Sequence, residues 1–132
     1  MNKHKQLVKS MNDNSSDALV MFCDSSSRWF LKFLKPKYRH CFVAIKSSSD
    51  WIVYEPLLNR TEITIIRDSK AFEVRKCFES MGCTVVACNI NRKEIKPLSM
   101  LMPFTCVRAV GRVLGANLQY IFTPYQLYKS IK

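Results

Sequence analysis

The sequence predicts an α+β fold in which a small antiparallel sheet packs against helices. Short runs of β-branched and aromatic residues, each bounded by turn-forming residues, favour strands. Stretches with apolar residues at helical spacing, closed by Gly or Pro, favour helices between and after them. The chain has 132 residues, of which 48% are hydrophobic, so it can bury the core of one domain without disulfide or metal staples.

The expected strands follow one another closely along the chain. The polar segment Lys46–Ser49 separates two of them and predicts a hairpin. Pro56 ends the second strand of that hairpin, because proline donates no hydrogen bond to a sheet. The expected strands are Ala18–Phe22, Tyr38–Ile45, Asp50–Glu55, Glu62–Ile66 and Thr84–Ile90.

Helices are expected where caps and stop signals bracket an apolar stripe. Pro36 ends the first of them, Gly82 and Gly115 close the next two, and Pro124 lies in the first turn of the last. The expected helices are Arg28–Lys35, residues 69–81, Thr105–Leu114 and Thr123–Lys132.

The domain organisation is predicted to be simple. Residues 1–16 are polar and basic and indicate a flexible lead-in, which leaves residues 17–132 as a single domain without internal repeats. No apolar run approaches the roughly 20 residues that cross a bilayer, and the run at Ala18–Cys23 is too short for the core of a signal peptide. We therefore expect a protein without a transmembrane segment, in the cytoplasm of the producing cell.

The net charge of +11 indicates a partner or a strongly solvated surface. Between Arg28 and Lys46 the chain has six Lys or Arg residues and no acid. Such a balance favours contact with an anionic polymer, such as nucleic acid or an acidic cell-wall or membrane polymer. A basic surface without a specific partner explains the charge equally well, so both interpretations stay open.

The six cysteines are predicted to be reduced thiols. They show no CxxC and no zinc-ligand spacing, and most lie inside apolar runs, where cysteine packs as a small hydrophobic residue. Cys106 differs, because it lies at the start of a predicted helix after Pro103-Phe104-Thr105. A helix amino terminus stabilises negative charge and so favours the reactive thiolate.

Cys106, His40 and Glu55 are the candidate catalytic residues. An imidazole beside a thiol can take its proton and later protonate a leaving group, and an acid can orient that imidazole. Pairing Ile45 with Asp50 around the predicted turn sets His40 directly opposite Glu55 on one face of the sheet. A slip of one residue would break that pair.

These residues also carry a resemblance to a known family. A strand beginning with His, a hairpin partner bearing an acid, and a distant Cys opening a helix resemble the circularly permuted NlpC-type branch of the papain-like cysteine peptidases and amidases. Cys41 departs from that pattern, which usually has a small or apolar residue after the His. The matching segments, in chain order, are Asp17–Phe22, Tyr38–Ile45, Val53–Pro56, Phe104–Val110 and the Thr-Pro ending Thr123–Tyr128.

The resemblance implies a papain-like fold and a thiol hydrolase that works through a thioacyl intermediate. It implies a Cys106–His40–Glu55 triad, no metal or organic cofactor, and a peptide, isopeptide or other amide as substrate. Related lipid acyltransferases leave acyl transfer open as the outcome. The backbone N–H of Cys106 is the natural oxyanion donor.

Other interpretations of the same residues stay open. Cys106 could be a core thiol, His40 a structural residue of a strand, and Glu55 the partner of a Lys or Arg. The protein would then be a non-catalytic binding protein, or a virion structural protein of phage type, that contacts nucleic acid or another anionic polymer. The second histidine, His4, lies in the lead-in and is a poor candidate for the base.

Overall fold

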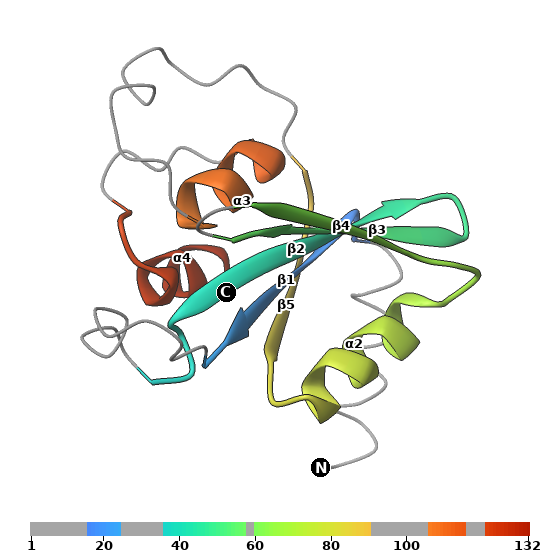
Figure 1. Cartoon of the computed structure of the whole chain (residues 1–132), viewed down its shortest axis with the longest axis horizontal. Helices are drawn as coiled ribbons and strands as arrows, with labels where there is room; N and C mark the ends of the chain where they lie inside the picture. The colour runs from blue at the N-terminus through green and yellow to red at the C-terminus, as the bar shows by residue number, and fades with distance from the viewer. Residues whose placement is uncertain (1–15, 25–35, 58–59, 91–105, 116–120) are drawn as a thin grey trace.

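A computed structural model describes residues 16–24, 36–57, 60–90, 106–115 and 121–132 (Figure 1). Its centre is a five-stranded sheet in the order β4-β3-β2-β1-β5, and every neighbouring pair is antiparallel. The prediction of an α+β fold with a small antiparallel sheet is confirmed. The strands are β1 (Ala18–Cys23), β2 (His40–Ser47), β3 (Asp50–Pro56), β4 (Thr61–Ile66) and β5 (Thr84–Cys88); the helices are α2 (Ala71–Ser80), α3 (Cys106–Leu114) and α4 (Pro124–Ile131).

Helices cover both faces of the sheet around its central strand β1, whereas the edge strand β4 is largely exposed. In Figure 1, α2 lies on one side of the sheet and α3 and α4 on the other. Alternate residues of strand β1 are buried on opposite faces. Val20 and Phe22 pack in the cluster on the side of α3 and α4, and Leu19 and Met21 pack in the cluster on the side of α2. All of Ala18–Phe22 is fully buried. A strand buried on both faces needs a continuous apolar run rather than an alternating one.

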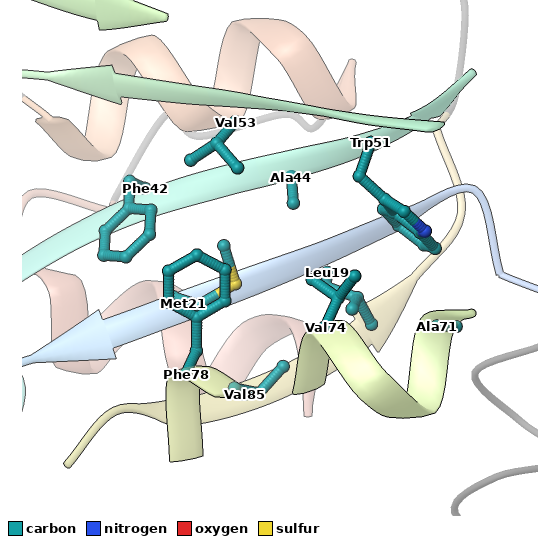
Figure 2. Close-up of a cluster of buried hydrophobic side chains, with 10 residues drawn as sticks. All are labelled: Leu19, Met21, Phe42, Ala44, Trp51, Val53, Ala71, Val74, Phe78 and Val85. Carbon is teal, nitrogen blue, oxygen red and sulfur yellow. The ribbon is translucent and has the colours of Figure 1, made fainter. Parts of the chain in front are cut away.

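The α2 face forms a cluster of aliphatic and aromatic side chains (Figure 2). Trp51 of β3 is fully buried there, and its indole Nε1 donates to the carbonyl of Ser69 at 3.0 Å. This satisfies the one polar group of the ring, as burial of tryptophan requires. Arg75 of α2 is also buried, and its guanidinium donates to the carbonyl of Val85 at 2.7 Å.

Local signals place the helix ends well. Gly82 follows α2 with φ +90°, and Gly115 follows α3 with φ +67°, conformations that glycine adopts without a Cβ clash. Thr123 caps α4, its side-chain oxygen accepting from the N–H of Gln126 at 3.2 Å. The predicted stop and start signals are therefore confirmed to within one to three residues.

Some predictions fall outside the described residues. These are the lead-in up to residue 15, the helix over Arg28–Lys35 and the start of the helix predicted from Thr105. Within the described ranges, no helix is long and apolar enough to span a bilayer.

The β2–β3 hairpin has a shorter turn than the sequence predicts. The structure pairs Ser47 with Asp50, not Ile45 with Asp50, and leaves only Ser48 and Ser49 in the turn. Ser48 has φ +57°, which suits a tight two-residue hairpin turn. The prediction of the register was wrong by two positions. Because side chains alternate with a period of two, this shift keeps every residue on its predicted face.

The prediction that all cysteines are free thiols is wrong for two of them. Cys23 and Cys83 form a disulfide, and Cys41, Cys77, Cys88 and Cys106 are free. The last antiparallel pair of β1 and β5 joins Phe22 to Thr84, so Cys23 and Cys83 occupy the next facing positions. Cysteines that face each other across neighbouring strands come close enough to bond.

Candidate active site

The structure brings together the three residues that the sequence singles out. His40 is the first residue of β2, Glu55 lies near the end of β3, and Cys106 is the first residue of α3. The imidazole Nε2 of His40 lies 3.2 Å from Oε1 of Glu55. The side chains of His40 and Cys106 also interact, and each shifts the pKa of the other. Since Nε2 meets Glu55, the remaining ring nitrogen, Nδ1, is the one left for the sulfur.

Glu55 faces another acidic residue, Glu62, but contacts His40 through its carboxylate. Directly across on β4 stands Glu62, which would repel Glu55 if its charge were uncompensated. Arg60 pairs with Glu62 at 2.8 Å and compensates that charge. The side chain of His40 is 14% exposed and that of Glu55 is 30% exposed, so solvent screens their contact only in part.

Helix α3 anchors Cys106 against the sheet. Val107, Val110 and Leu114 are buried in the cluster on this face, and Cys106 packs against the same cluster while remaining partly exposed. As the first residue of the helix, Cys106 lies where backbone N–H groups have no intrahelical acceptor. The first turn contains no acidic residue, so no carboxylate competes for these donors.

The environment lowers the pKa of the Cys106 thiol to about 5. The largest cause is a hydrogen bond from the side chain of Cys41; a bond with His40, the backbone N–H of Cys41 and the charge of His40 act in the same direction. Burial of the sulfur opposes them but does not prevail. Cys106 is thus a thiolate at neutral pH, as a nucleophile requires.

The pKa of His40 is shifted upward, which favours the imidazolium form. Burial is the largest single influence and lowers the pKa. The hydrogen bond and charge of Cys106, together with the charge and hydrogen bond of Glu55, outweigh burial and raise it. A negative group on each side of the ring therefore favours the protonated ring, in the same direction as the lowered pKa of Cys106 favours the thiolate.

Sequence reasoning did not include Cys41 among the candidate residues, although Cys41 follows His40 directly and interacts with Cys106. The available signal was its departure from the family pattern directly after the His. Tyr38, two residues before His40, packs its ring in tilted or edge-on geometry against the rings of Phe22 on β1 and of Tyr125 and Tyr128 on α4.

The described residues contain no group of three or more His, Cys, Asp or Glu side chains that could hold a metal ion. Comparison of the chain with models of known protein families, with curated proteins and with solved structures finds no match.

Proposed function

We propose that this protein is a thiol hydrolase of the papain-like, permuted NlpC type, with Cys106 as nucleophile, His40 as general base and acid, and Glu55 as the group that orients His40. The observation that supports it best is one continuous chain of contacts. The Cys106 sulfur meets the His40 ring, and the opposite side of that ring meets Glu55 at 3.2 Å. Three separate elements supply these groups, so neighbourhood in sequence does not explain their meeting.

The charges define the reacting form. Between the Cys106 pKa of about 5 and the raised pKa of His40, the site holds a thiolate and an imidazolium. The thiolate attacks the carbonyl carbon of an amide or ester and forms a C–S bond. Charge develops on the carbonyl oxygen, where the backbone N–H of Cys106 is positioned to donate.

Breakdown of this intermediate needs a proton. The imidazolium of His40 donates it to the leaving nitrogen or oxygen as the C–N or C–O bond breaks, which leaves a thioester on Cys106 and a neutral ring. The neutral ring then takes a proton from water, whose oxygen attacks the thioester and releases the acid and the thiolate. Glu55 stabilises the imidazolium at both stages in which the ring is charged, before acylation and after the ring has taken the proton from water. With an alcohol or amine in place of water, the same steps give acyl transfer.

The proposed substrates are amides, including cell-wall peptides and isopeptides, and this assignment rests on the family resemblance. The fold is compatible with it, since α3 presents Cys106 at the end of an antiparallel sheet whose neighbouring strands bear His40 and Glu55. No organic cofactor takes part in the proposed steps. We propose the cytoplasm of the producing cell as location, with association with a virion as the alternative.

A thiol-selective acylating probe tests the proposal. An activated ester should acylate Cys106 at pH 7 and be turned over, and intact mass and peptide mapping locate the adduct. In His40→Ala, acylation and release should fall by about 10²–10⁴-fold, the usual contribution of a general acid–base. Cys77, an exposed free thiol, is the internal reference in the same sample. Acylation of Cys106 no faster than of Cys77 would overturn the proposal.

The net charge of +11 supports a second candidate, a non-catalytic protein that binds nucleic acid or another anionic polymer. Binding of duplex DNA should then weaken steeply with salt concentration. It should also be unchanged in Cys106→Ala, since the thiol has no part in it. DNA binding of this kind together with an unreactive Cys106 would favour this candidate over the hydrolase.

A further inference from the structure

The neighbourhood of Cys106 contains a second thiol, that of Cys41. Cys41 follows His40 directly in β2 and is 0% exposed. It belongs to the buried cluster that includes Val107 of α3, and Cys106 packs against this cluster. Two free thiols from different elements therefore meet inside the candidate site, one buried and one open to solvent.

The backbone of β2 also directs a donor toward the sulfur. The N–H of Lys46 donates to the carbonyl of Asp17, next to β1, at 2.9 Å. Along a strand, the N–H and C=O groups of consecutive residues point alternately to the two neighbouring strands. Since those of Lys46 point to β1, those of Cys41 and Val43, at odd distances from Lys46, point to β3. The β2–β3 ladder ends at the pair of Val43 and Tyr54. The N–H of Cys41 lies one step beyond that end, and from there the backbone of Cys41 acts on the Cys106 sulfur and lowers its pKa.

From this geometry, and resting on the proposed function, we propose that Cys41 is a positioning residue that holds the Cys106 sulfur as a thiolate through two donors, its backbone N–H and its thiol S–H. The sulfur then accepts bonds from both groups of one rigid strand residue. The ring of His40, which meets the same sulfur, is attached to the preceding residue of that strand. Strand β2 thus presents the base and the two donors as one unit.

The titration of the two thiols supports this division of roles. Burial, followed by the hydrogen bond and charge of Cys106, raises the pKa of Cys41 well above its usual range, so Cys41 stays protonated and donates. The pKa of Cys106 moves in the opposite direction. Neighbouring groups whose pKa values are driven apart hold different protonation states at one pH. The ionisable groups near the sulfur are His40 and Cys41, Glu55 through His40, and Arg108 in the first turn of α3.

The pH dependence of the alkylation of Cys106 tests the proposal. Iodoacetamide reacts with thiolates, so the rate at Cys106, followed by peptide mass spectrometry, reports the thiol pKa independently of catalysis. Cys41→Ala removes the S–H donor and keeps the backbone N–H. The loss of a hydrogen bond to a charged group shifts a pKa by about one to two units. We therefore expect the acid limb of the profile, the pH range in which the alkylation rate rises, to move to higher pH by that amount. Because the pKa of Cys106 in the wild type is about 5, the rate at pH 5 should fall by about five- to fiftyfold.

Two further variants serve as controls. Cys41→Ser keeps a donor of similar size, so its acid limb should lie between those of the wild type and Cys41→Ala. Cys88→Ala removes another free cysteine that packs against the same cluster, and it should leave the limb unchanged. If Cys41→Ala fails to fold, Cys41→Val fills the space without a donor and replaces it. Circular dichroism checks the fold of each variant.

The outcomes separate this proposal from the proposed function. An unchanged acid limb in the folded Ala or Val variant overturns the role of Cys41, even where acylation of Cys106 still depends on His40. A limb that moves as expected supports the role of Cys41. Failure of the acylating probe to distinguish Cys106 from Cys77 would overturn the hydrolase alone.

Discussion

Nε2 of His40 contacts Oε1 of Glu55 at 3.2 Å although the two residues do not face each other across the β2–β3 hairpin. With Ser47 paired to Asp50, Glu55 is offset from His40 by two positions along the strand. Diagonal neighbours of this kind on one face lie within reach of long or aromatic side chains. The imidazole and the carboxylate together span the distance that the register leaves.

Replacement of Glu55 by Gln should impair the site through His40. The variant keeps the shape of the side chain but removes the charge that raises the pKa of His40. We expect that pKa to fall, and the rate of acylation of Cys106 to fall by about 10- to 100-fold, the value of a hydrogen bond to a charged group. The chain has two histidines, so the imidazole titration of His40 can be followed by NMR.

Glu62→Gln is the matched control for this prediction. Glu62 stands directly across from Glu55 on β4 and bonds to Arg60, not to His40. It should change neither the His40 titration nor acylation of Cys106. Equal effects of the two variants would mean that the overall negative charge of this region, and not the contact of Glu55 with His40, sets the pKa of the His40 ring.

The pH dependence of acylation and of alkylation should differ. Alkylation needs only the thiolate, so its rate should rise through pH 5, the pKa of Cys106, and then stay constant. Turnover of an amide also needs the imidazolium, so it should rise over the same range and fall as the pH passes the raised pKa of His40. A bell-shaped profile for turnover beside a plateau for alkylation is the expected result. The apparent values belong to the coupled pair.

Both profiles can be measured on one preparation, with iodoacetamide for alkylation and a fluorogenic peptide amide for turnover. An acid limb of alkylation near pH 8.5, the value of an ordinary cysteine, would contradict the assignment of Cys106 as a stabilised thiolate.

Much of the fold could be predicted because its signals are local. Gly82 and Gly115 mark helix ends through their positive φ, and Thr123 marks a helix start through its cap. The fully buried β1 reads as a continuous apolar run. Each of these signals acts within a few residues of the chain, so no knowledge of the tertiary structure is needed to interpret it.

Contacts between distant segments could not be predicted in the same way. The pairing of β1 with β5 decides that Cys23 faces Cys83, and nothing near either residue indicates it. The position of Cys41 against Cys106 likewise depends on how α3 packs on β2. The contact of His40 with Glu55 was expected even with the wrong register, because an error of two positions preserves the face.

Arg75 should stabilise the packing of α2 on the sheet. It is 5% exposed, and its guanidinium bonds to the carbonyl of Val85 at 2.7 Å and to Glu79 at 3.2 Å. Arg75→Met keeps the apolar stem but removes these donors, and it should lower the free energy of unfolding by about 1–3 kcal/mol. Urea denaturation measures the change. Lys76→Met, at the next and exposed position of α2, should change the stability by less than about 0.5 kcal/mol.

The Cys23–Cys83 disulfide joins residues separated by 60 positions. A thiol reagent added to the denatured, unreduced protein should label four of the six cysteines, and all six should react after reduction. Cys83→Ser frees Cys23 and should therefore yield five reactive thiols without reduction. Cys77→Ser, which removes an exposed free thiol, should yield three before reduction and five after it.

Reduction should also lower the stability, because a crosslink restricts the unfolded chain. The typical effect is about 2–4 kcal/mol, and urea denaturation with and without a phosphine reductant measures it. Cys23 pairs with His40 across β1 and β2, so loosening this end of β1 should also slow acylation of Cys106. Six reactive thiols without reduction would contradict the disulfide. That result would instead fit the reduced state that a cytoplasmic location predicts, since cytosolic thiols are kept reduced.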